Sequence, residues 1–241
     1  MGLQGRAQGS AGKALAKVAE DIVACGRCSR LRRYCEGVAR ERRRAYADQQ
    51  YWGRPVPGFG DPSARLLVVG LAPAAHGGNR TGRVFTGDSS GDWLYEALHR
   101  HGWANQPEST GRDDGLKLTG AYVTAAARCA PPGNKPTPAE FSNCREYLAR
   151  EITLLDKVVV VVALGSLGHE HWLRASRWWE RLAPRERPKF AHGAEAWLEG
   201  GPLLLASYHP SRQNTNTKRL TRAMWHAVFA RAREAVDAAG G

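Results

Sequence analysis

Residues 65–70 read Arg-Leu-Leu-Val-Val-Gly, a short apolar run that ends in glycine. A run that is apolar at every position, rather than at alternate positions, is typical of a strand buried on both faces of a sheet. Three more short apolar segments follow, at residues 122–126, 158–165 and 203–207. We expect all four segments to be strands of one sheet.

Between these strands the apolar residues recur at helical spacing. The expected helices cover residues 91–102, 137–155, 168–180 and 218–237. The second of them begins with a capping pair, Thr137 followed by Glu140. Strands that alternate with helices indicate a parallel sheet. The sequence therefore predicts an α/β fold, a three-layer α/β/α sandwich around a central four-stranded parallel sheet.

The chain before the first strand is expected to add helices to this single domain. Residues 1–12 are rich in Gly, Ala and Gln and are predicted to be disordered, so the domain is assigned to residues 13–241. Helical spacing begins at residue 13, and a basic helix is expected to extend to about residue 48. Residues 50–62 are rich in Pro, Gly and aromatic residues and are predicted to be a loop.

The chain carries 35 Lys and Arg against 23 Asp and Glu, a formal net charge of +12. Such an excess favours polyanionic partners, because binding to phosphates releases condensed counterions. A genome rich in G and C, which encodes Arg in place of Lys, explains the same excess. The arginine-rich stretch at residues 32–44 has the same two interpretations. It is either a solvated helix face or a surface that follows a nucleic-acid backbone.

No segment has the roughly 20 apolar residues that a membrane span requires. The N-terminus lacks the apolar core of a secretory signal, so we expect a cytoplasmic protein without a membrane anchor. The chain has five cysteines, and an odd number without an export signal argues against a disulfide framework. Cys25 and Cys28 form a Cys-x-x-Cys pair well before the first strand, a position that favours metal binding over thioredoxin-type redox chemistry.

Polar segments rich in Gly and Asn follow three of the expected strands, after residues 70, 127 and 207. In parallel sheets, functional loops lie at the carboxyl ends of the strands, so these segments should meet in one crevice. The first loop matches neither the P-loop nor the dinucleotide-binding motif. The third reads His-Pro-Ser-Arg-Gln-Asn-Thr-Asn-Thr from His209, which places small hydrogen-bond donors suited to phosphate directly after a strand.

Two of these loops carry a resemblance to a known family. Gly70-Leu-Ala-Pro-Ala and His209-Pro-Ser resemble the two motifs of the uracil-DNA glycosylase superfamily, and within it the broad-specificity family 5, or type B, branch. The resemblance extends from about Cys25 to the final helix. It implies a monofunctional DNA glycosylase that flips a base out of the duplex and hydrolyses its N-glycosidic bond, which initiates base excision repair. The implied bases are uracil, hypoxanthine, xanthine and ethenocytosine.

The resemblance also implies roles for single residues. His209 would donate a hydrogen bond to the base carbonyl, and Phe85 would stack on the flipped base. Ser211 would hold a phosphate. Arg212 and Gln213 are candidates for the wedge that fills the vacated position in the stack, which indicates double-stranded DNA as the partner. The protein is expected to act as a monomer.

The water-activating residue departs from the pattern of the better-known branches. Leu71 and Ala72 occupy the motif position at the pocket and cannot act as a base. The resemblance indicates Asp88 and Asn134 instead, although Asp88 is also suited to cap the helix that follows it. His76 either lines the same pocket or has a structural role.

The cysteines match the four-thiolate set by which this branch binds a [4Fe–4S] cluster. The set consists of Cys25, Cys28, Cys129 and Cys144. Four thiolates also suit Zn²⁺, and their spacing does not separate the two. Cys35 is left over, as a free thiol or as a replacement for one ligand.

Two other functions are compatible with parts of the sequence. A metal-stabilised nucleic-acid-binding module without catalysis would explain the basic charge and the missing acid in the first motif. An enzyme of free nucleosides is disfavoured by the charge of +12 and by the phosphate-suited loop.

Overall fold

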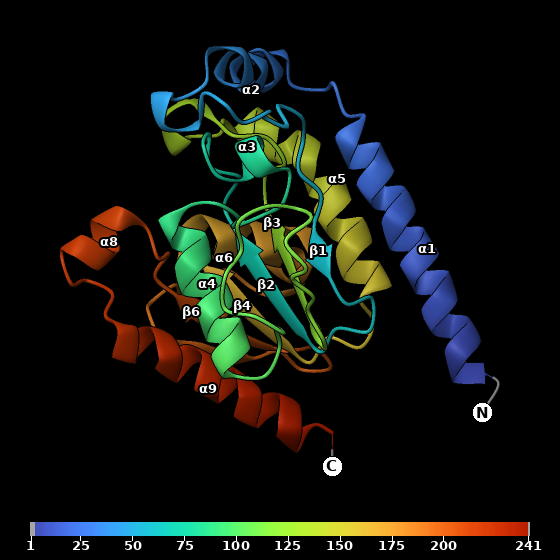
Figure 1. The fold of residues 1–241 in the computed structure, drawn as a ribbon. Helices are drawn as coiled ribbons and strands as arrows, with labels where there is room; N and C mark the ends of the chain where they lie inside the picture. The colour runs from blue at the N-terminus through green and yellow to red at the C-terminus, as the bar shows by residue number, and fades with distance from the viewer. Residues whose placement is uncertain (1–2, 241) are drawn as a thin grey trace.

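The computed structural model describes residues 3–240 of the chain. In this range six strands form one central sheet with the order β1-β3-β2-β4-β6-β5 (Figure 1). The four inner strands run parallel, and each is buried at every position. They are β2 (Leu66–Gly70), β3 (Ala121–Ala125), β4 (Val160–Leu164) and β6 (Leu203–Ser207). The four predicted strands and their parallel arrangement are therefore confirmed.

The sheet also has two short edge strands that the sequence analysis does not predict. β1 (Phe59–Gly60) pairs antiparallel with β3, and β5 (Glu195–Trp197) pairs antiparallel with β6. β1 has two residues, and β5 exposes two of its three side chains, so neither leaves the continuous apolar run that marks an inner strand. The predicted four-stranded sheet is corrected to six strands, with the predicted four at its centre.

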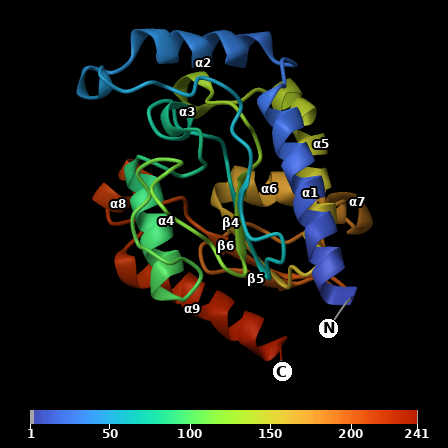
Figure 2. The same ribbon diagram turned by 45° about the vertical axis from the view of Figure 1, so that its right-hand side comes forward.

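Helices cover both faces of the sheet, as expected for an α/β/α sandwich (Figure 2). Alternate residues of β2 point to opposite faces. Leu66 and Val68 belong to one hydrophobic core, whereas Leu67 and Val69 belong to the other. The inner strands are apolar throughout because each face contributes to its own core. The first core lies under α4 (Ser89–Arg100) and α9 (Arg222–Ala238), and the second under α5 (Pro138–Leu154) and α6 (Gly165–Ala175).

The N-terminal helix α1 (Leu3–Val23) lies along α5 on the outside of the sandwich (Figure 2). An ion pair between Asp21 and Arg150, at 2.8 Å, joins the two helices. α1 begins at Leu3 rather than at residue 13, and residues 1–2 of the segment predicted to be disordered lie outside the described range. Within residues 3–240 no helix has both the length and the apolar character that crossing a bilayer requires.

Several helices differ from the predicted boundaries. α2 (Ser29–Glu41) ends well before residue 48, because Arg42 leaves the helical conformation with a φ of 52°. The predicted helix at 168–180 is divided into α6 and α7 (Trp178–Arg181) at Arg177, whose φ is 64°. Short helical turns also occur in segments that the sequence analysis assigns to loops or to other elements. They are η1 (Arg44–Tyr46), α3 (Gly78–Thr81), η2 (Pro132–Asn134), α7 (Trp178–Arg181) and α8 (Arg212–Asn216).

Candidate active site

Two loops meet at the carboxyl edge of the sheet. The first follows β2, and the second follows β6. The Ser90 hydroxyl, at the end of the first loop, donates a hydrogen bond to the carbonyl of Pro210 at 3.0 Å and joins the two. A cavity of about 40 Å³ lies between them. It is lined by Ala72, Pro73, Ala74, Val84, Phe85, Asp88, Ser90, Ala125 and His209.

Phe85 forms one wall of this cavity. Its ring stacks on the imidazole of His209, with the ring centroids 5.7 Å apart and 28° between the planes. Phe85 has a φ of 50°, an uncommon value for a residue with a side chain, so the backbone turns sharply at this point. Its ring lies over the end of β2, where a side chain at Gly70 would overlap it. Glycine at the end of β2 therefore makes room for the aromatic wall.

His209 faces Phe85 from the second loop. Burial lowers the pKa of His209 to about 4, so its imidazole is neutral near pH 7. The side-chain amide of Asn214 donates to the backbone carbonyl of His209 at 2.8 Å and fixes the loop at this residue. A neutral imidazole keeps one ring N–H, so His209 is able to donate one hydrogen bond to a molecule in the cavity.

Asp88 both lines the cavity and caps α4. Its Oδ1 atom accepts hydrogen bonds from the backbone N–H groups of Ser90 at 3.0 Å and Gly91 at 3.1 Å. Its Oδ2 atom lies against Gly77, where any side chain would overlap it. Burial raises the pKa of Asp88, and the two N–H donors act in the opposite direction. One carboxylate oxygen is thus engaged by the helix cap, and the other accepts no hydrogen bond from residues 10–240.

The middle of the first loop is tied to its surroundings by buried polar side chains. Arg80 donates to the carbonyls of His76 at 2.8 Å and Gly87 at 2.7 Å, and also to the side chain of Gln49. The Nδ1 atom of His76 lies 3.0 Å from the hydroxyl of Tyr51. His76 is not among the residues that line the cavity, and its contacts support the structural alternative.

A second buried cation fixes the part of the loop that carries Phe85. Arg83 forms an ion pair with Asp114, and it also donates to the hydroxyls of Thr86 at 3.0 Å and Ser109 at 2.8 Å. Asp114 in turn accepts backbone N–H bonds from residues 110, 111 and 116. The network joins the cavity wall to the segment between α4 and β3.

The sequence of this region matches a known family. A family model described as "Uracil DNA glycosylase superfamily" matches residues 57–233, which include both loops. The chain belongs to the uracil-DNA glycosylase superfamily. The resemblance that the two motifs indicated is therefore confirmed.

Similar proteins place the chain near one branch of the superfamily. It is 51% identical to the "Type-5 uracil-DNA glycosylase" of Mycobacterium leprae over 86% of this chain and 90% of that protein. It is 51% identical to the protein of the same description from Thermus thermophilus, over 89% and 94% of the two chains. For Pyrobaculum aerophilum the identity is 46%, over 88% of each chain. These identities confirm the predicted likeness to the type 5 branch.

The residues predicted to hold a phosphate and to act as the wedge come shortly after His209 in the chain. The hydroxyl of Ser211 accepts a hydrogen bond from the backbone N–H of Asn214 at 3.3 Å and caps the short helix α8. Arg212 and Gln213 are exposed on the first turn of that helix. Their exposure beside the cavity is compatible with contact to DNA, and the wedge role stays a prediction.

Two of the residues assigned to the pocket lie elsewhere. Ala72 lines the cavity, but Leu71 packs against a neighbouring apolar cluster around Phe141. Asn134 is exposed, with a φ of 57°, and does not line the cavity. The structure brings Asp88 and His209 to the same cavity, but it does not bring Asn134 there.

Sequence reasoning missed several residues that build the cavity. Pro73, Ala74 and Val84 contribute to its walls, and Ser90 connects its two loops. Ser90 stands two residues after a predicted helix cap, which is a local signal for a backbone contact. No local signal shows that its hydroxyl reaches Pro210, because that contact joins residues 120 positions apart.

Four of the five cysteines surround the junction of α1, α2, β3 and α5. Cys25 and Cys28 lie between α1 and α2, Cys129 follows β3, and Cys144 is in α5. Burial raises the pKa of Cys28, and it raises the pKa of Cys144 to about 11. Negative charge on Cys28 or on Cys129 raises the pKa of Cys144 further.

Cys35 lies in the same region, buried against Cys129. Contact with the Cys35 thiol, together with burial, raises the pKa of Cys129. The side-chain amide of Asn143 lies 3.4 Å from the sulfur of Cys28 and donates to it. Among residues 3–240, no three cysteine, histidine or acidic side chains are close enough together to hold a single metal ion.

Proposed function

We propose that this protein hydrolyses the N-glycosidic bond of uracil in DNA. The observation that carries the proposal is one cavity that holds the carboxylate of Asp88, the neutral imidazole of His209 and the ring of Phe85. The 51% identity to type 5 uracil-DNA glycosylases over most of the chain supports the same reaction. A base inside a duplex cannot reach such a cavity, so the reaction requires the nucleotide to be flipped out of the stack.

The departing base needs a hydrogen-bond donor and a stacking surface. When the bond from the sugar to the base breaks, negative charge develops on the base. The N–H of His209 stabilises this charge at a base carbonyl oxygen. Because burial keeps His209 neutral, it acts as a hydrogen-bond donor and the base leaves as an anion. The ring of Phe85, parallel to within 28° of the imidazole, provides a flat apolar surface for the base.

The sugar needs a negative charge and a positioned water. The free Oδ2 atom of Asp88 is able to accept a hydrogen bond from a water and to stabilise the positive charge that develops on the sugar. The water oxygen bonds to the sugar carbon as the base departs, and the proton released by the water balances the anionic base. The helix cap holds the other carboxylate oxygen, so the position of Asp88 is set before the substrate binds.

We infer that the base specificity extends beyond uracil. Ala125, at the end of β3, lines the cavity with a methyl group only. An apolar wall imposes no hydrogen-bond pattern on the base, and such a wall discriminates weakly between bases. Hypoxanthine, xanthine and ethenocytosine are the further substrates that we propose.

The partner is double-stranded DNA, and the protein releases the base without cutting the strand. Arg212 and Gln213 are exposed on α8, close in sequence to His209 of the cavity, and this exposure supports the proposed wedge. The net charge of +12 favours the phosphate backbone. None of the described residues that line the cavity is a lysine, the residue that would form a Schiff base with the opened sugar.

We propose further that Cys25, Cys28, Cys129 and Cys144 hold a [4Fe–4S] cluster. All four donors are thiols, Cys28 packs against the apolar cluster that contains Cys129, and a hydrogen bond to the sulfur of Cys28 suits a thiolate ligand. A bound cluster would join α1, α2, β3 and α5 at one point. Iron and acid-labile sulfide in the purified protein, lost in Cys144→Ser and kept in Cys35→Ser, would support the cluster. Zinc in place of iron would contradict the cluster and indicate a zinc site with the same four cysteines.

The activity is tested with a duplex oligonucleotide that carries one uracil, followed by hot alkali to cut the strand at abasic sites. Asp88→Asn keeps a good helix cap, because Asn and Asp cap helices equally well. We expect this variant to keep its thermal stability but to release uracil about 10²- to 10⁴-fold more slowly in single turnover. His209→Ala should lose about 10²- to 10³-fold, as for other lost transition-state donors.

Asp156→Asn is the matched control, since Asp156 is exposed just before β4, at the opposite edge of the sheet. It should retain the wild-type rate. If the wild-type protein binds the duplex but yields no abasic site, the chain is a binding module without catalysis. If Asp88→Asn cleaves at the wild-type rate, Asp88 serves only as a cap.

A further inference from the structure

Two exposed arginines lie over the ring of the same tryptophan, at some distance along the chain from both motif loops. The guanidinium carbon of Arg112 lies 4.3 Å from the centre of the Trp52 ring, and that of Arg54 lies 5.8 Å from it. The indole N–H of Trp52 donates to the carbonyl of Pro55 at 3.1 Å, which fixes the ring. Gly82 lies against this ring and against Arg112, and its φ of 78° suits glycine. We call these three side chains the Arg-Trp-Arg stack.

Both guanidinium groups of the stack have free N–H edges. Neither Arg54 nor Arg112 forms a hydrogen bond or ion pair with any of residues 10–240, and both side chains are exposed. Many other arginines, such as Arg83 and Arg150, are paired with carboxylates. A guanidinium in close contact with the face of an aromatic ring, as Arg112 is at 4.3 Å, keeps a fixed plane, so its N–H groups are oriented to bind an oxyanion in a bidentate manner, and Arg54 adds a second cation over the same ring.

A continuous surface connects the stack to the base cavity. Asp88 lines the cavity and also a groove of about 760 Å³, whose wall includes Arg80, Arg112 and Arg212. Arg112 also lines a second groove, of about 470 Å³, together with Trp52 and Arg54. The two grooves therefore extend from the cavity wall to the stack.

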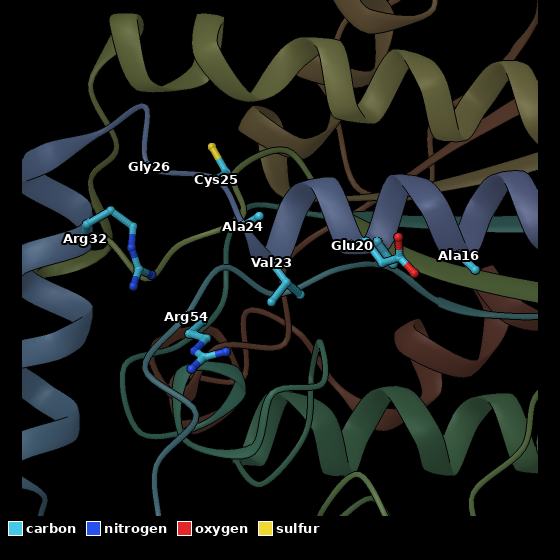
Figure 3. Close-up of a pocket in the computed structure, with 9 residues that line it drawn as sticks. Ala16, Glu20, Val23, Ala24, Cys25, Gly26, Arg32 and Arg54 are labelled. Atoms are coloured by element: carbon cyan, nitrogen blue, oxygen red, sulfur yellow. The ribbon is translucent and has the colours of Figure 1, made fainter.

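The surface continues toward the cysteine segment. Arg54 lines a third hollow, of about 820 Å³, together with Arg32 and Cys25. Figure 3 shows Arg32 from α2 and Arg54 both directed into the space beside the bend at Gly26. One guanidinium nitrogen of Arg32 is buried without a hydrogen-bond partner among the described residues.

We propose that the Arg-Trp-Arg stack binds the phosphates of the DNA strand on one side of the flipped nucleotide. This inference rests on the proposed function, which supplies the strand. Asp92 and Asp113 line the first groove too, so overall charge alone does not select an anion there. The selection comes from the oriented N–H edges of Arg112 and Arg54, which match phosphate oxygens in geometry as well as in charge. The stack would hold the strand while the base occupies the cavity.

The test measures binding to a duplex that carries a tetrahydrofuran abasic analogue, which the enzyme cannot cleave, over a range of salt concentrations. Each phosphate contact contributes about 0.9 to the slope of log K against log salt. Arg112→Ala and Arg54→Ala should each lower this slope by about 0.9, and each should weaken binding about eightfold at 0.1 M salt. Arg185→Ala is the control, because it removes the same charge from a side chain that is 87% exposed and lines none of these grooves.

A second variant tests the stack itself without a change of charge. Trp52→Leu removes the ring that orients both guanidiniums, so it should weaken binding, and Arg112→Ala should then cost less than it does in the wild type. Circular dichroism verifies that each variant is folded. Slopes for Arg112→Ala and Arg54→Ala equal to that of Arg185→Ala would overturn the proposal. Uracil release by the wild type is measured in parallel. If the wild type releases no uracil, the proposed glycosylase function fails, whereas unchanged slopes alongside normal uracil release contradict only the role of the stack.

Discussion

The loop after β2 and the loop after β6 both reach the base cavity, but buried side-chain contacts hold only the first along its length. In the first loop Asn79, Arg80 and Arg83 are all at most 8% exposed, and each forms hydrogen bonds to other segments. The second loop is held near His209 and Pro210, and the next turn presents Arg212 and Gln213 to solvent. The difference separates a preorganised pocket wall from a surface that is free to contact DNA.

The largest expected effect comes from breaking the buried ion pair of the first loop. Arg83→Leu leaves Asp114, Ser109 and Thr86 without their common donor, and the loss of one partner of a buried pair costs about 3–5 kcal/mol. We expect the free energy of unfolding in urea to fall by this amount. Arg83→Lys keeps the charge but not the forked geometry of the guanidinium. Its free energy of unfolding should therefore lie between that of the wild type and that of Arg83→Leu. A loss below about 0.5 kcal/mol would show that the loop does not depend on this network.

A smaller effect is expected from displacing Asp88 without changing it. Gly77→Ala places a methyl group where the Oδ2 atom of Asp88 now lies, so the carboxylate must move. A displacement of about 1 Å at a catalytic group can cost about 10²-fold in rate. We expect a loss of this size in single-turnover uracil release. Gly12→Ala, where a methyl group meets only an ordinary contact with Pro62, is the control and should keep the wild-type rate.

The second loop should make the stability of the protein depend on pH. The pKa of His209 is about 4 in the folded protein and about 6.5 in an unfolded chain. Between these values the unfolded chain binds a proton that the folded protein does not, so stability is lost as the pH falls from 6.5 to 4. The contribution is at most about 1.4 kcal/mol per pH unit. His209→Asn should reduce the slope of unfolding free energy against pH in this window, and an unchanged slope would contradict the burial of a neutral imidazole.

The smallest effect on stability is expected at the tip of the second loop. The side chain of Arg212 is exposed and forms no hydrogen bond or ion pair with residues 10–240, so Arg212→Ala should change the free energy of unfolding by less than about 0.5 kcal/mol. The same variant removes a cation from the groove beside the cavity and should weaken duplex binding. A large loss of stability would show that the tip of the second loop, like the first loop, contributes to the stability of the fold.

Local sequence was sufficient for the inner sheet and for the motif loops. Each inner strand is buried on both faces and therefore apolar at every position, which is a signal that a single segment carries. The edge strands β1 and β5 carry no such signal, because their pairing depends on β3 and β6 rather than on their own side chains. Asp88 caps α4 and also lines the cavity, and of these two features only the cap is a local pattern that the sequence carries.

The sequence by itself determined the α/β class, the superfamily and the identity of Asp88, Phe85 and His209 as candidates, since these depend on short motifs and on residue periodicity. Only the tertiary structure decided which loop residues line the cavity. It placed His76 in the framework and Asn134 at the surface, and it left the guanidiniums of Arg54 and Arg112 free. Such outcomes depend on contacts between residues far apart in the chain, as between Ser90 and Pro210, and no local pattern encodes them.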